Sequence, residues 1–168
     1  MTVQYLCLLL LLILFYVEAS ELKSVGISLD NNKTGAVSTA SVIFTVVNEV
    51  PSGGKIHIIF PSGFTLPSTI NNPTISASSG LTGNVITASK SGTRTIVVSL
   101  GAGTSLSDNA VDVTIGIPEC VNPRISQTTG TFQIETRDST SPGALSRKRT
   151  RCKMTPRFQT ASGCRSVA

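Results

Sequence analysis

Tryptophan is absent from the 168-residue chain, and aromatic residues make up only 5% of it. A true immunoglobulin domain packs a buried Trp against a disulfide that joins two facing strands. The cysteines of this chain are not placed on two facing strands either. These absences argue against a true immunoglobulin domain and leave at most an Ig-like topology.

Histidine occurs once, at His57, and no nucleophile motif or metal-binding spacing accompanies it. The chain contains no G-x-S-x-G, no H-E-x-x-H and no glycine loop of the kind that cradles a phosphate. We therefore expect no catalytic residues, no cofactor and no metal site, and hence a protein that is not an enzyme. Because of its position in an alternating strand, we interpret His57 as a solvent-facing residue.

Cysteines are few, and one of the four, Cys7, lies in the N-terminal apolar segment. Cys120, Cys152 and Cys164 remain, and an odd number permits at most one internal disulfide. The third thiol would be free or paired between chains. A bridge from Cys120 to either Cys152 or Cys164 would attach the C-terminal segment to the domain, and the sequence does not choose between them.

Acidic residues are absent after Asp138, so residues 139–168, which we call the basic tail, carry a charge of +7, whereas residues 1–138 carry −2, which gives the net charge of +5. The tail has no hydrophobic periodicity and few large apolar residues, so we expect it to be disordered. Arg147, Lys148, Arg149 and Arg151 form its densest cluster. That cluster is interpreted as a solvated charge run, with a patch for polyanions or membrane surfaces and a dibasic processing site as alternatives. No aromatics interleave the charges, so nucleic acid is not expected as a partner.

The only long apolar run covers residues 6–17, which is shorter than the roughly 20 residues that span a bilayer. Val17 and Ala19 occupy the −3 and −1 positions of a cleavage site before Ser20. This pattern predicts a secretory signal peptide over residues 1–19, and a secreted or extracellular mature chain without a transmembrane segment. The alternative is a signal anchor, because the segment has no Lys or Arg at its start.

Alternation of polar and apolar residues predicts strands and gives no helical spacing beyond one turn. The expected strands are 22–29, 38–47, 55–60, 94–100, 111–117 and 129–137, with shorter extended pieces at 64–66, 74–76 and 85–87. Pro118 is expected to end its strand, residues 101–109 to form a loop, and Gln133 and Glu135 to face outward. About seven or eight short strands separated by turns predict an all-β fold, an antiparallel Ig-like β-sandwich over residues 20–138.

The segment 30–35 begins like a calcium loop, with oxygen-bearing side chains at alternate positions and glycine sixth. The twelfth residue of that frame is Ser41 and not the Glu that an EF-hand requires, so we interpret the segment as a hairpin turn. It contains Asn32-Lys33-Thr34, the only N-glycosylation sequon, because proline excludes Asn72 and Asn122. We expect a glycoprotein modified at Asn32, the alternative being an unmodified polar turn.

Three stretches carry a resemblance to a known kind of domain: residues 51–64, 115–123 and 129–138. Together they resemble the repeated β-sandwich modules of large cell-surface proteins in ciliates and other protists, with relatives in bacteria. In those modules a "PxGGxIxIxFPxGF" strand is followed by "I.NP" and then by "TGxFxIxTxD". The resemblance covers residues 22–138, about one module, and the basic tail does not match it.

The resemblance implies a structural or adhesive role, with other surface proteins or glycans as partners. The sequence therefore favours a secreted or cell-surface structural or adhesive module without catalytic activity. The alternative is a soluble secreted carbohydrate- or polyanion-binding factor that uses the basic tail.

Overall fold

The computed structural model describes residues 22–124 and 130–137, and the backbone alone of residues 149–153 and 165–167. The predicted signal peptide, residues 1–19, lies outside the described residues. All regular secondary structure in the described part is β-strand, and all its strand pairs are antiparallel. No helix there is long and apolar enough to cross a membrane.

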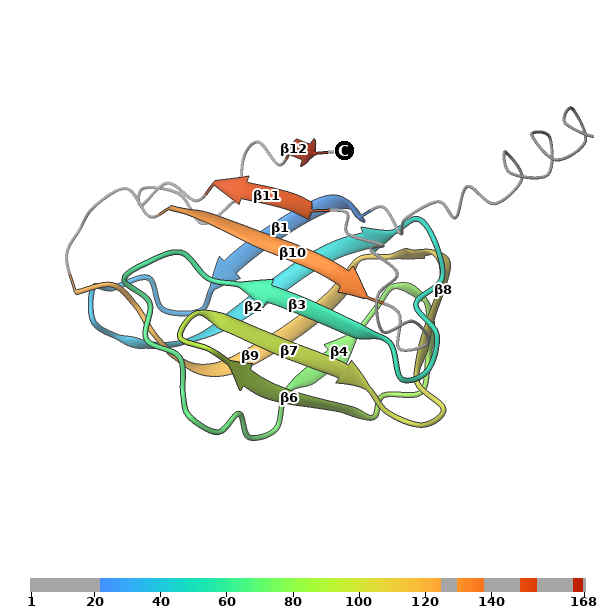
Figure 1. Cartoon of the computed structure of the whole chain (residues 1–168), viewed down its shortest axis with the longest axis horizontal. Helices are drawn as coiled ribbons and strands as arrows, with labels where there is room; N and C mark the ends of the chain where they lie inside the picture. Colours follow the sequence, from blue (N-terminus) through green and yellow to red (C-terminus); the bar gives the residue numbers. More distant parts are fainter. Residues whose placement is uncertain (1–21, 125–129, 138–148, 154–164, 168) are drawn as a thin grey trace, which may run out of the picture.

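Two main sheets face each other in the manner of a β-sandwich (Figure 1). The smaller has the strand order β1-β2-β9-β4, with bounds Leu22–Leu29, Val37–Val46, Val113–Val121 and Thr74–Ser76. The larger has the order β12-β11-β10-β3-β7-β6, with bounds Arg165–Val167, Arg149–Lys153, Thr131–Arg137, Lys55–Ile59, Thr95–Leu100 and Ile86–Ser91. A third sheet pairs β5 (Ser79–Thr82) with β8 (Ser105–Val111).

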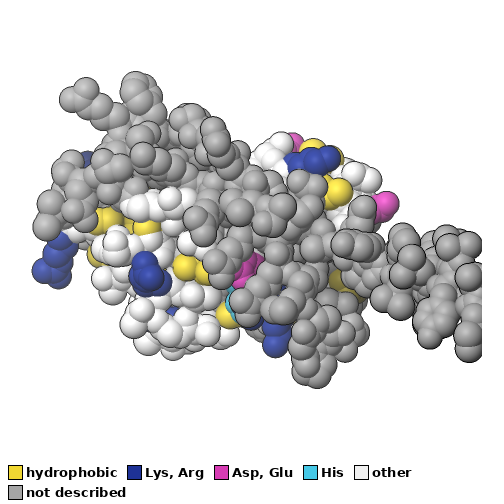
Figure 2. Space-filling model, turned by 45° about the horizontal axis from the view of Figure 1, so that its top comes forward, with side chains coloured by type: hydrophobic (Ala, Val, Ile, Leu, Met, Phe, Trp, Pro, Cys, Tyr) yellow, Lys and Arg dark blue, Asp and Glu magenta, His cyan; other side chains and the backbone are white. Residues whose placement is uncertain are grey.

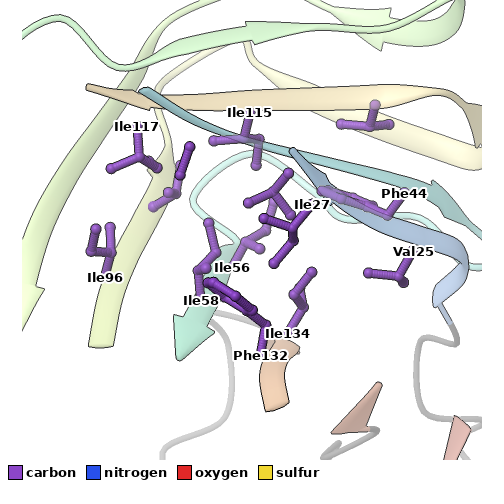
Figure 3. Packing of buried hydrophobic residues seen from close by; sticks show 14 of the residues in the cluster. Val25, Ile27, Phe44, Ile56, Ile58, Ile96, Ile115, Ile117, Phe132 and Ile134 are labelled. Atoms are coloured by element: carbon purple, nitrogen blue, oxygen red, sulfur yellow. The ribbon is translucent and has the colours of Figure 1, made fainter. Parts of the chain in front are cut away.

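The core lies between the two main sheets because alternate residues of each strand point to the same side. In β2 every second residue is buried, and β3 and β7 follow the same pattern. Figure 3 shows side chains of the two sheets meeting in this space. The residues labelled there are Val25, Ile27, Phe44, Ile115 and Ile117 from the smaller sheet, and Ile56, Ile58, Ile96, Phe132 and Ile134 from the larger.

Strand β3 is held in place by the turn that precedes it. Gly53 has a φ of 83°, in the region that favours glycine, and its N–H donates to the Leu100 carbonyl at 3.0 Å. Gly54 is equally restricted, because a Cβ there would lie 2.6 Å from Cγ1 of Val50. The two glycines thus let the chain enter β3 directly beside β7. This explains why both occur in the first motif, by which we mean the stretch 51–64; the second and third motifs are 115–123 and 129–138.

Three phenylalanine rings join the first motif to the third. Phe60 and Phe64 follow β3, whereas Phe132 lies on β10, and all three are buried. Their ring centroids are 5.2 to 5.7 Å apart with interplanar angles of 62 to 66°, the edge-to-face geometry that aromatic pairs prefer. We call this group the Phe cluster. Stretches that lie far apart in the sequence therefore form one piece of the core.

The expectation that Pro118 ends its strand is wrong, because β9 continues to Val121. Two residues, Pro118 and Glu119, stand opposite the single residue Thr39 of β2, and Glu119 has a φ of 61°. This is a β-bulge, which leaves its extra residue out of the ladder of hydrogen bonds. A proline, which has no N–H to donate, is tolerated at such a position.

The expectation of a loop over residues 101–109 holds for 101–104, where the Thr104 N–H donates to the Gly101 carbonyl. It is wrong from Ser105 onward, since β8 begins there and pairs with β5, which the pattern did not reveal. Only Leu106 and Ala110 of β8 are buried, and polar residues fill the positions between them. Periodicity could not detect this strand because so few large apolar residues mark its inner face.

Glu135 lies on the outward-facing side of its strand, as alternation predicts, opposite His57, but its side chain is only 1% exposed. Alternation identifies the side of the strand on which a residue lies and not what packs over that side. Strand β10 is an interior strand, so Glu135 has neighbours on both β3 and β11, namely His57 and Arg149 in the registers.

The basic tail departs from the expected disorder in two places. The backbone of β11 pairs with β10, and β12 pairs with β11. The registers place Arg149 opposite Glu135, and Arg151 opposite Gln133. The expectation of a tail without structure is therefore wrong for these two strands, and the rest of the tail lies outside the described residues.

Candidate functional site

The β1–β2 turn, which resembled a calcium loop in sequence, uses its side-chain oxygens internally. Oδ1 of Asp30 accepts hydrogen bonds from the Ser38 hydroxyl and the Thr39 N–H, both at 2.8 Å. These bonds, that from Thr39 first, lower the pKa of Asp30. Oδ1 of Asn31 accepts from the Lys33 N–H at 3.1 Å, which forms a local turn. This geometry supports the interpretation of the segment as a hairpin turn.

Asn122, which directly follows β9 and belongs to the second motif, connects the end of β9 to this turn by hydrogen bonds. Its Nδ2 donates to the carbonyl oxygens of Asn31 at 2.6 Å and Lys33 at 3.0 Å. Its backbone N–H donates to the Ala36 carbonyl at 2.9 Å. Asn122 is only 4% exposed, and its Oδ1 has no hydrogen-bond partner in the described structure. We call this arrangement the Asn122 clamp.

In the sequence, Asn122 is noticeable only as part of the stretch 115–123 and as an asparagine that the following proline excludes from N-glycosylation. Its role as a clamp was missed, because it depends on contacts between residues about ninety positions apart. The adjacent Pro123 contributes through its carbonyl, which accepts from the Gly35 N–H at 3.1 Å. The Asn-Pro pair thus closes one end of the sandwich.

Asn32, the predicted glycosylation site, lies in the turn that the clamp supports. Asn32, Lys33 and Thr34 are all exposed. Their neighbour Asn31, by contrast, is held by its side chain and by its carbonyl. The sequon is therefore accessible, and the backbone of its turn is held by the hydrogen bonds from Asn122.

His57 lies on the outer face of the larger sheet, where sequence placed it, but it is half-buried. In the registers of its two neighbouring strands it stands opposite Glu135 on β10 and Val97 on β7. Burial is the main cause that lowers the pKa of His57, and the charges of Arg137 and Lys55 lower it further. The carboxylate of Glu135 acts in the opposite direction.

Glu135 is the ionisable residue that sequence reasoning missed at this position. Its Oε2 accepts from Nη2 of Arg137 at 3.1 Å, and the Arg137 side chain is 43% exposed. A buried carboxylate is unfavourable unless it is paired and hydrogen-bonded, and Arg137 provides such a partner. A signal for the cluster was present in the sequence, since one alternating strand carries both charges, but its burial depends on strand order.

The ionisable cluster of His57, Glu135 and Arg137 lies on two neighbouring strands, with His57 on β3 opposite Glu135 on β10. Among the described residues, no group of three or more His, Cys, Asp or Glu could hold a metal ion. Figure 2 shows the Lys and Arg side chains of the described part lying apart on this face, without forming a continuous basic patch. Among these side chains, Glu135 and Arg137 form an ion pair on the outer face of the larger sheet.

Cys120 carries a free thiol that is fully buried in the smaller sheet. The thiol donates to the carbonyl oxygens of Ile117 at 3.7 Å and Pro118 at 3.9 Å, and burial raises its pKa to about 11. The backbone of Cys152 lies in β11 of the larger sheet, opposite Phe132. The side chain of Cys152, and all of Cys164, lie outside the described residues.

The basic cluster is divided by the structure. Arg149 and Arg151 lie within β11, whereas Arg147 and Lys148 lie outside the described residues.

The chain matches no protein-family model and no curated protein at a significant level. Function is therefore inferred from the residues themselves and from the motifs to which they belong.

Proposed function

We propose that the chain is a secreted or cell-surface structural or adhesive module without catalytic activity, built as an Ig-like sandwich. The proposal rests on the resemblance of three motifs to the repeated modules of protist and bacterial surface proteins. In such modules the motifs maintain the fold, and recognition belongs to the exposed surface. Other surface proteins or glycans are the partners that this role implies.

The observation that carries the proposal is that residues of all three motifs belong to one core cluster, among them Ile56, Ile115 and Phe132. The Phe cluster joins the first motif to the third, with ring centroids 5.2 Å apart between Phe60 and Phe132. The second motif supplies the Asn122 clamp, which fixes the turn between β1 and β2. Stretches that lie far apart in the sequence thus stabilise the same fold. This is what motifs that define a module should do.

Secretion is tested by expressing the tagged chain from its own first codon in a eukaryotic secretory host. The chain is expected in the medium or on the cell surface, with Ser20 as its first residue after cleavage. Recovery from the cytosol with an intact N-terminus would contradict the proposal. Retention on the cell surface with residues 1–19 uncleaved would instead indicate the signal anchor.

Adhesion is tested with beads that carry the mature chain at defined density. Such beads are expected to aggregate with one another or to attach to the surface of the secreting cells, whereas beads coated with the heat-denatured chain should not. A chain that folds and yet supports neither type of contact would argue against an adhesive role. A hydrolase or transferase activity that is lost in His57→Ala would argue against a non-catalytic one.

The charge distribution favours one alternative, a soluble carbohydrate- or polyanion-binding factor. Seven Lys and Arg and no acidic residue follow Ser139. This alternative predicts retention on heparin that weakens as salt rises, because exposed charges are screened. Substitution of Arg147, Lys148, Arg149 and Arg151 by Ser, or a chain ending at Asp138, should abolish that retention. Equal retention without these charges would exclude the alternative.

A further inference from the structure

The sequon turn combines two properties that a site of covalent modification requires. Asn32 and the sequon residue Thr34 are exposed, so a bulky group attached there would meet no core residue. No hydrogen bond in the described part of the chain involves the amide of Asn32. The neighbouring amide of Asn31 differs, since its oxygen accepts from Lys33.

The backbone on either side of Asn32 is fixed by bonds that do not use its side chain. The carbonyl groups of Asn31 and Lys33 both accept from the Asn122 clamp. Gly35 closes the turn with a φ of 68° and donates to the Pro123 carbonyl. A group attached to the Asn32 amide therefore would not disturb the bonds that hold the turn.

We propose that Asn32 carries an N-linked oligosaccharide in the mature protein. In the transfer step, Nδ2 of Asn32 forms a bond to the anomeric carbon of a lipid-linked oligosaccharide. The bond from that carbon to the polyprenyl diphosphate breaks, the diphosphate leaves with the electron pair, and one amide proton is released. The transfer is carried out by the oligosaccharyltransferase of the secretory pathway, so the inference rests on the secretion proposed above.

The glycan would project from the end of the sandwich where the β1–β2 turn meets the end of β9. This end is distinct from the outer face of the larger sheet, which carries His57 and Lys55. A hydrated oligosaccharide would thus extend from the turn between β1 and β2. The turn thus acquires a function that its hydrogen bonds alone do not provide.

The test uses the full chain, expressed in a eukaryotic secretory host in two forms. One form keeps residues 1–19, and the other has a signal peptide of known activity in their place. Peptide-N-glycosidase is expected to reduce the mass of both forms and to convert Asn32 to Asp, as read by mass spectrometry. The enzyme should act without denaturant, because the turn is exposed in the folded protein.

Two variants define the site. Asn32→Gln and Thr34→Ala should each lose the glycosylated form completely, since both remove the sequon while keeping the clamp. Asn84→Gln, at an exposed asparagine outside any sequon, should leave the glycan unchanged.

The two forms separate the possible failures. An unmodified Asn32 in the secreted form with the known signal would overturn the glycan proposal, even though secretion succeeded. Modification with the known signal but not with residues 1–19 would support the site and contradict the proposed secretion. Release of the glycan only after denaturation would overturn the placement of Asn32 on an accessible turn.

Discussion

At the scale of single residues, Asn122 contributes most of what the second motif provides. Its amide is buried and donates to two carbonyl groups of a turn that is distant in sequence. Breaking such an arrangement is costly, because two carbonyl groups of the turn then lose the donor that the buried amide supplies. The residue therefore connects local turn structure to the closure of the whole sandwich.

Asn122→Ala is expected to lower the free energy of unfolding by about 1–3 kcal/mol, since two carbonyl groups lose a buried donor. Urea unfolding measures this value, and amide hydrogen exchange at Gly35 should become faster because its turn loosens. Asn84→Ala, at an exposed site, should change stability by less than about 0.5 kcal/mol. Equal stability of the two variants would show that the clamp has no energetic role.

His57 makes stability depend on pH through its half-buried position. Its pKa is lowered from 6.5 in the folded state, mainly by burial, so the folded protein favours the neutral ring. The unfolded chain binds a proton more readily, and stability from this group is present above pH 6.5 and lost as pH falls through the folded pKa. Urea midpoints measured from pH 7 downward should decrease more for the native protein than for His57→Gln. A parallel decrease in both proteins would assign the effect to other groups.

At the scale of strands, alternation predicted those that have one apolar and one polar face. The expected bounds 22–29 and 74–76 match β1 and β4, those of β3 and β7 differ by one residue at one end, and those of β2 by one residue at both ends. Strands β5 and β8 were missed because their apolar residues are small or sparse. The length of β9 was missed because a bulge accommodates Pro118. In each case the missing information is which strand lies alongside: β5 and β8 pair with each other, and the bulge in β9 lies against β2. The pattern of one strand does not contain this information.

The burial of Glu135 and the clamp of Asn122 were missed for the same physical reason. Both depend on which segments lie beside each other, and not on local propensity. By contrast, the exposed sequon turn at Asn32 could be predicted, because its polar composition and its glycine are local signals. Local chemistry thus identified the turn, whereas long-range register determined the surroundings of the ionisable cluster.

The pairing of β11 with β10 can be tested by its register. Thr131 stands opposite Lys153, and directly opposed residues of antiparallel strands have Cα atoms about 4.5–5.5 Å apart. That separation suits a disulfide. Thr131→Cys with Lys153→Cys, in a chain with Cys152→Ser and Cys164→Ser, is expected to form an internal cross-link visible on a non-reducing gel.

The matched comparison pairs Thr131→Cys with Arg151→Cys, which are offset by two residues and therefore lie too far apart for efficient bonding. Equal cross-linking of both pairs would indicate that residues 149–153 have no fixed register on β10. A cross-linked dimer would indicate that the strand comes from a second copy of the chain. Either result would contradict the observed pairing within one chain.

At the scale of the whole molecule, the two sheets are joined mainly by a continuous apolar core. Residues of both main sheets belong to this one cluster, and the Phe cluster forms part of it. A core of this kind should make the sandwich unfold as one cooperative unit, because no part of either sheet can expose its inner face alone. The motifs that carry the resemblance would then be coupled energetically as well as in space.

This coupling can be measured with a double-mutant cycle on Phe60 and Phe132, whose ring centroids are 5.2 Å apart. Each single change to Leu removes a ring while keeping an apolar side chain, and loss of the edge-to-face pair should give a coupling energy of about 0.5–1.5 kcal/mol. Phe44, buried in the smaller sheet and outside the Phe cluster, provides the comparison: Phe44→Leu combined with Phe60→Leu removes no edge-to-face pair of that cluster and should give a smaller coupling energy. Additivity in both cycles would mean that the first and third motifs stabilise the sandwich independently, and their contact would then be a consequence of the fold rather than part of what maintains it.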